Sequence, residues 1–199
     1  MEKLILNVES KDQIIAYRDE IRLSHYELAI FAEILAAAES GDAETKKWFG
    51  NFGDSFRSII MNVHAYRKGL EFGFTEIAFD QYGWFSRPQF LAVEKLIFGN
   101  EKRYGEHSTL KIGKGIGNVW TNALSYSFGT AGGGCGLSVY GKQFKSRGAA
   151  VDAGILELKT MMTAKVGDSD QSNYNPQVIR GTLSAIAKYE VESVQLTLF

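Results

Sequence analysis

The uneven distribution of glycine constrains the fold of this chain most strongly. Eleven of the 21 glycines lie between Gly105 and Gly148, in less than a quarter of the 199 residues. Glycine weakens helices but suits turns and close backbone approaches, so this stretch favours strands and hairpins. Before it, apolar residues recur at helical spacing. We therefore expect the secondary structure to change near residue 104.

The first hundred residues have the features of a helical region. Ser10–Gln13 and Ser24–Glu27 fit capping boxes, and an i, i+3, i+4, i+7 apolar stripe begins at Leu28. Gly69 is placed to end a helix that Asp54 could cap. The patterns predict helices starting near 10 and 24, over 43–49, over 54–69 and over 86–99, with a strand within 70–82.

The second half alternates rather than repeating at helical spacing. The pattern predicts strands at 110–112, 120–128 and 137–140, with 129–136 as a hairpin connection, helices from Ser146 and Pro176, and alternation over 194–198. We expect an α+β fold in which a helical half, 1–100, packs on an α+β region, 101–199. That region would hold an antiparallel sheet of about three strands and two helices. Without a linker, the halves are expected to form one compact unit.

Composition excludes several classes of protein. Hydrophobic residues make up 45% and charged residues 23%, as in ordinary globular chains. No apolar run approaches the roughly 18 residues of a membrane span, and the N-terminus turns polar too early for a signal peptide. The single cysteine, Cys135, excludes an intrachain disulfide. We expect a cytoplasmic protein that does not associate with membranes.

The net charge of −1 hides a strongly basic stretch. Between Lys102 and Arg147 there are seven Lys and Arg residues and one acid, Glu106, which gives this stretch +6. Local positive charge attracts phosphate groups at low salt. A nucleic-acid surface and a solvated basic face that contacts nothing both fit this asymmetry.

The residue patterns favour a binding protein over an enzyme. Neither glycine cluster fits a phosphate-binding loop followed by a helix, and the histidines lack metal-ligand spacing. Asp152, Glu157 and Lys159 resemble a nuclease motif only in residue type, since they lie in a helical pattern. We expect no catalytic residues, no metal and no cofactor. A small enzyme with a site around Asp152 and Glu157 remains a third hypothesis.

The last five residues carry the most specific local motif. Gln195-Leu196-Thr197-Leu198-Phe199 resembles the short peptide by which bacterial DNA-processing proteins bind the replication sliding clamp. In that resemblance Gln195 would bind a pocket rim, while Leu198 and Phe199 would fill apolar pockets. Thr197 departs from the usual serine or aspartate. An edge strand with Leu196 and Leu198 packed inside explains the same alternation.

The segment 138–159 resembles small nucleic-acid-binding modules in which a sheet is followed by a helix. These include the arm-binding domains of integrases and double-stranded RNA-binding domains. The resemblance implies that bases at the strand end and helix start contact phosphates. An ordinary α+β subdomain is the alternative. The predicted nucleic-acid-binding residues are Lys111, Lys114, Lys142, Lys145 and Arg147.

Aromatic residues in an expected loop suggest a second surface. Trp84 and Phe85 lie beside Arg87, and exposed aromatics suit base stacking or a protein contact. We therefore expect a non-enzymatic nucleic-acid-binding accessory protein of a bacterial or mobile-element DNA transaction system. DNA is favoured over RNA, and the sliding clamp is a candidate partner. The alternative is a phage or plasmid interaction module that inhibits a host or defence protein.

Overall fold

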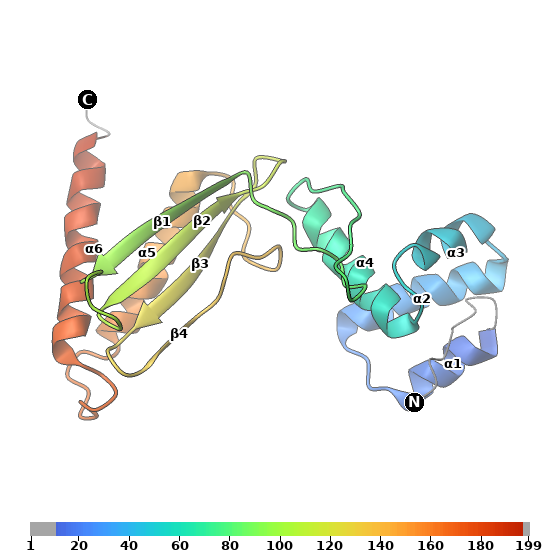
Figure 1. Cartoon of the computed structure of the whole chain (residues 1–199), viewed down its shortest axis with the longest axis horizontal. Helices are drawn as coiled ribbons and strands as arrows, with labels where there is room; N and C mark the ends of the chain where they lie inside the picture. Colours follow the sequence, from blue (N-terminus) through green and yellow to red (C-terminus); the bar gives the residue numbers. More distant parts are fainter. Residues whose placement is uncertain (1–10, 197–199) are drawn as a thin grey trace. The chain divides into compact units, whose positions relative to one another are not determined.

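The computed structural model describes residues 11–196 and divides the chain into two compact units, Met1–Pro88 and Gln89–Phe199 (Figure 1). The first unit is helical in its regular structure. The second combines an antiparallel sheet with two helices. The α+β class with a helical N-terminal half is therefore confirmed.

Four helices lie in the described part of the first unit, residues 11–88. They are α1 (Lys11–Glu20), α2 (His25–Ser40), α3 (Ala43–Gly50) and α4 (Phe56–Leu70). Polar side chains start three of them: Glu27 accepts from the Ser24 N–H at 2.7 Å, and Asp42 accepts from the Thr45 N–H at 3.0 Å. Ser55, rather than the expected Asp54, caps α4 by accepting from Ser58 N at 3.2 Å. The predicted cap at Ser10 lies outside the described residues.

An apolar core rich in phenylalanine holds these helices together. Phe49, Phe52 and Phe56 are almost fully buried, and Tyr17 and Phe31 pack their rings near Phe56. Such aromatic contacts add to the burial of their apolar area. Among the described residues, the buried cluster comprises Ile14, Ile30, Phe31, Ile34, Phe49, Phe52, Phe56, Ile59, Ile60 and Val63.

Two predicted elements between residues 70 and 99 are wrong. Segment 70–82 has no regular strand and only an isolated bridge between Phe79 and Phe85. The helix expected over 86–99 is replaced by β1 (Ala92–Gly99), whose eight residues all pair with β2. The apolar residues Val93, Leu96 and Ile97 fit helical spacing too, but pairing with β2 satisfies the backbone of this segment instead.

The sheet of the second unit is an antiparallel meander. β1 pairs with β2 (His107–Lys114), β2 with β3 (Trp120–Ser127), and β3 with β4 (Gly132–Gly134). β4 lies within the stretch expected to be a connection. Its glycines allow a close approach, because a Cβ on Gly134 would lie 2.6 Å from the Ser125 Cα. The strand predicted over 137–140 is wrong: this segment is irregular and ends in a turn.

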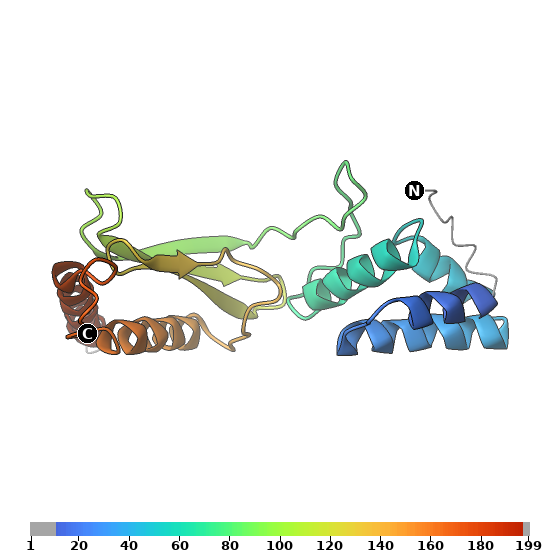
Figure 2. The ribbon, with the colours of Figure 1, turned by 90° about the horizontal axis from the view of Figure 1, so that it is seen from below.

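Two helices cover one face of this sheet, as Figure 2 shows. α5 (Arg147–Thr163) packs on β2 and β3, and α6 (Pro176–Leu196) packs on β1 and β2. The core between them and the sheet includes Leu110, Ile112, Leu158 and Ile186. Both helices begin where the sequence predicts, at a Ser146 cap and at Pro176.

The end of α6 corrects one expectation. Residues 194–196 belong to this helix, so the alternating edge strand predicted for 194–198 does not form there. Residues 197–199 lie outside the described part of the chain. Within residues 11–196, no helix combines the length and apolar character that crossing a membrane requires.

Candidate functional site

Two of the predicted phosphate-binding lysines precede the start of α5. Phe144 forms an isolated bridge with Trp120: its N–H donates to the Trp120 carbonyl at 2.8 Å and its carbonyl accepts at 2.9 Å. This bridge fixes the preceding loop along the edge of β3. Lys142 and Lys145 lie on either side of Phe144 and are both exposed. Ser146 follows and accepts from the Ala149 N–H at 3.1 Å.

Lys114 reaches the same end of the sheet from β2. It is the register partner of Trp120, and its Nζ lies 5.6 Å from the centre of the indole ring. A cation over a tryptophan ring is attracted by the negative face of the ring. Lys114 is half-buried. Trp120 pairs with Lys114 on one side and with Phe144 on the other, so the Lys114 ammonium group lies at the same end of the sheet as the loop that carries Lys142 and Lys145.

Arg147 forms an ion pair with the carboxylate of Glu94. Its Nη2 lies 2.6 Å from Glu94 Oε2, and its Nε donates to Glu94 Oε1 at 2.8 Å. These hydrogen bonds lower the pKa of Glu94 from its ordinary value. The pair joins β1 to the first residue of α5, so Arg147 stabilises the fold in addition to carrying charge.

Lys111 lies on the other side of the sheet. Its neighbours Leu110 and Ile112 point into the core under α5 and α6, so Lys111 points away from the helices and is exposed. Its register partner on β1 is Lys95, which is also exposed. Lys95 is absent from the predicted site because the apolar spacing of residues 86–99 also fits a helix. Alternation of Leu96 and Phe98 with Lys95 was the available signal.

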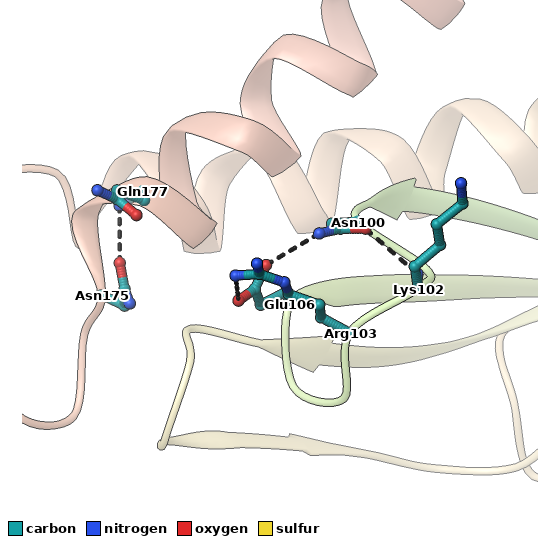
Figure 3. Close-up of polar contacts among 6 residues, drawn as sticks. All are labelled: Asn100, Lys102, Arg103, Glu106, Asn175 and Gln177. Atoms are coloured by element: carbon teal, nitrogen blue, oxygen red, sulfur yellow. Dashed lines mark hydrogen bonds and ion pairs between the residues drawn. The ribbon is translucent and has the colours of Figure 1, made fainter.

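The first two bases of the basic stretch belong to the opposite end of the sheet. Figure 3 shows the β1–β2 turn, where Glu106 accepts from Asn100 Nδ2 at 3.1 Å and from Arg103 Nη1 at 3.4 Å. Asn100 Oδ1 accepts from the Lys102 N–H at 3.2 Å, and the Lys102 side chain points away from this cluster. The single acid of the stretch therefore organises a turn.

Near this turn in Figure 3, α6 begins with a separate polar contact. Asn175 Oδ1 accepts from the Gln177 N–H at 2.9 Å, and the Asn175 N–H donates to the Phe128 carbonyl at 2.7 Å. These contacts satisfy backbone groups at the start of a helix. They assign Asn175 and Gln177 a local structural role.

The charges of the exposed lysines determine whether they can bind phosphate groups. Among the described residues, Lys111, Lys142 and Lys145 have no carboxylate oxygen within the 4.0 Å of an ion pair. Exposed ammonium groups beside a helix N-terminus can bind phosphates, since the first backbone N–H groups of the helix also favour anions. Such contacts position a nucleic acid but do not read its sequence.

Asp152 and Glu157, the acidic residues of the possible enzyme site, do not point into one pocket. Asp152 lines a hollow of about 290 Å³ between α5 and α6, together with Lys159 and Glu190, which form an ion pair at 2.9 Å. Glu157 is exposed and does not line it. No cluster of three or more histidine, cysteine or acidic residues that could hold a metal occurs within residues 11–196.

The two aromatic residues predicted to contact a partner, Trp84 and Phe85, differ in their exposure to solvent. Tyr82 and Trp84 are exposed, with exposed fractions of 77% and 43%. Phe85 is half-buried and packs against the core of the first unit, with its ring centre 5.9 Å from that of Tyr66. Trp84 is thus available to a partner, whereas Phe85 anchors the turn.

A buried asparagine holds this aromatic turn in place. Asn62 Nδ2 donates to the carbonyls of Phe52 and Gly83 at 2.7 and 2.9 Å, and its Oδ1 accepts from the Phe85 N–H at 2.9 Å. Asp80 accepts from the N–H groups of Tyr82 and Trp84. Nothing in the local sequence marked Asn62, because its partners lie 10 to 23 residues away.

The C-terminal motif is described only in part. Gln195 and Leu196 belong to the last turn of α6, while Leu198 and Phe199 lie outside the described residues. Comparison with protein-family models, curated proteins and solved structures finds no match to this chain.

Proposed function

We propose that this protein binds nucleic acid through Lys142 and Lys145 at the start of α5, as an accessory protein of a bacterial or mobile-element DNA transaction system. The observation that supports it is a pair of exposed lysines without carboxylate partners among the described residues, held beside a helix N-terminus. Lys114 adds positive charge at the same end of the sheet.

The proposed contacts are with the phosphate backbone. Arg147, the residue best suited to paired hydrogen bonds with a guanine, is held by Glu94. Lysine ammonium groups act as point charges, so they favour phosphate without selecting a base. We therefore propose binding that depends strongly on salt and weakly on sequence, with DNA favoured over RNA.

Binding to labelled duplex DNA, single-stranded DNA and RNA at two salt concentrations tests the proposal. Wild-type protein is expected to bind at low salt and to lose affinity as salt rises. The double variant Lys142→Glu, Lys145→Glu should weaken binding and reduce the slope of log K against log salt by about 2, one for each lost contact.

The matched control changes the same charge elsewhere. Lys46 and Lys47 lie on α3 in the first unit, and Lys46→Glu with Lys47→Glu also changes the net charge by four. Equal losses in the two double variants would show an effect of net charge alone and contradict the proposed site. Absence of binding by wild-type protein at low salt would contradict the function itself.

The sliding clamp is the partner proposed for the C-terminal motif. Its support is the sequence Gln195-Leu196-Thr197-Leu198-Phe199. Binding of purified bacterial clamp to immobilised protein should disappear in a Leu198→Ala, Phe199→Ala variant whose melting temperature is unchanged. A large fall in the melting temperature would instead assign these residues to the core.

A protein-interaction module is the second candidate, and the rigid turn around Tyr82 and Trp84 favours it. Preformed exposed aromatics lose little freedom on binding and often dominate protein interfaces. This alternative predicts no salt-sensitive nucleic-acid binding. It predicts saturable binding of a purified host or defence protein that Trp84→Ala abolishes.

A further inference from the structure

The face of the sheet that α5 and α6 leave uncovered carries two exposed lysines on β1 and β2. We name it the open face, defined by Lys95 on β1 and Lys111 on β2, which point away from the helices. The two residues are direct register partners in the antiparallel ladder. Side chains in such positions have Cβ atoms about 4.5–5.5 Å apart.

The surroundings of this lysine pair supply little negative charge. The nearest carboxylate oxygen in the described chain is Glu101 Oε1, 4.0 Å from Lys95 Nζ, and both side chains are at least half exposed. On β3, the register partner of Lys111 is Ala123, which offers no polar group. Like charges directly opposite each other destabilise a sheet. An anion bound over the pair would remove that penalty.

Toward the start of α5 this face is covered by other parts of the chain, and Gly113 and Thr121 are buried there. Leu137 lies over Gly113, and Gly141 lies against the Thr121 hydroxyl, both on this face of the sheet. Lys142 follows Gly141 directly. The segment that covers this end of the face therefore leads directly into the loop before α5, while Lys95 and Lys111 stay exposed.

We propose that Lys95 and Lys111 together hold one phosphate of a nucleic acid that is also bound at the start of α5. This inference rests on the proposed function and extends the same surface by two residues. The spacing of the two side chains allows both ammonium groups to reach the same phosphate. On β3, Ser125 is small and exposed, so the backbone of a nucleic acid can approach the sheet there, whereas Ala123 is almost fully buried.

A double neutralisation tests this pair, because binding and stability should change in opposite directions. In Lys95→Gln, Lys111→Gln, removal of the repulsion should raise the melting temperature at low salt by about 1–4 °C. The same variant should bind duplex DNA about five- to tenfold more weakly, with a salt slope reduced by about 1. The control is Arg180→Gln, Lys188→Gln, which removes two exposed charges from α6.

Each outcome separates this inference from the proposed function. Weaker binding with an unchanged or higher melting temperature, and no comparable loss in the α6 control, supports it. Wild-type affinity in the Lys95, Lys111 variant, with a loss in the Lys142, Lys145 variant, overturns the inference and keeps the function. A fall in melting temperature shows that the pair is structural and also overturns it. Failure of wild-type protein to bind overturns both.

Discussion

Arg147 and Glu94 form a bidentate ion pair that links α5 to β1 across 53 residues of sequence. Arg147 Nη2 and Nε donate to the two carboxylate oxygens of Glu94 at distances of 2.6 to 2.9 Å. The pair fixes the first residue of α5 against the edge of the sheet. An arginine that the sequence assigned to nucleic-acid binding therefore has a structural partner.

Glu94→Gln should destabilise the protein modestly at neutral pH. Both side chains are more than a third exposed, so solvent screening limits the expected loss to about 0.5–1 kcal/mol. Urea unfolding measures it. Glu101→Gln, which removes a looser and more exposed pair with Lys95, serves as the control and should change stability less. Equal losses in the two variants would contradict a specific role for the Arg147 contact.

The same pair predicts a pH dependence. The hydrogen bonds from Arg147 lower the pKa of Glu94 in the folded state below its value in the unfolded chain. The contribution is therefore complete above the unfolded pKa of about 4.3 and is lost as pH falls through the folded pKa. The stability difference between wild type and Glu94→Gln should shrink below about pH 4. A difference that stays constant down to pH 2 would contradict this.

Elements with strong local signals were predictable from sequence. The caps at Ser24 and Ser146 and the start at Pro176 locate three helices, because a single polar side chain or a fixed φ marks each boundary. β1 was not predictable in this way. Its apolar residues fit both a helical and a strand period, and only its partner β2 decides between them.

The candidate site shows the same division. Lys142 and Lys145 precede α5, as the sequence placed them, but they lie in a loop and not at the end of a strand. The capture of Arg147 by Glu94 and the pairing of Lys95 with Lys111 depend on strand register, which a local pattern does not contain. Long-range geometry therefore determines which basic residues are available to a ligand.

The two helices of the second unit offer a matched pair of glycine substitutions. A Cβ on Gly154 of α5 would clash with the buried Leu110 side chain, so Gly154→Ala should cost about 1–3 kcal/mol through overpacking. Gly181 of α6 faces open space, and Gly181→Ala should stabilise by up to about 1 kcal/mol through helix propensity. Thermal unfolding of both variants checks the opposite signs. Stabilisation by both would contradict the close packing of α5 on β2.

Asn62 should be among the most sensitive polar positions of the first unit. Asn62→Ala removes three hydrogen bonds and leaves the buried Phe52 carbonyl and the half-buried Phe85 N–H without this partner, at an expected cost of about 2–4 kcal/mol. Denaturant unfolding gives the value. Asn51→Ala, at an exposed position after α3, is the control and should lie within about 0.5 kcal/mol of wild type. Similar losses at both positions would refute the anchoring role.

Trp84 and Phe85 are adjacent but should respond differently to truncation. Phe85→Ala removes a half-buried ring that packs near Tyr66 and Phe79, so we expect a loss of about 1–2 kcal/mol. Trp84→Ala should cost less than about 1 kcal/mol, because its ring is exposed while the Asn62 contacts hold the turn through Gly83 and Phe85. Urea unfolding of the two variants decides the order. A larger loss of unfolding free energy for Trp84→Ala would show that this ring belongs to the core. That result would contradict the proposal that the turn contacts a partner.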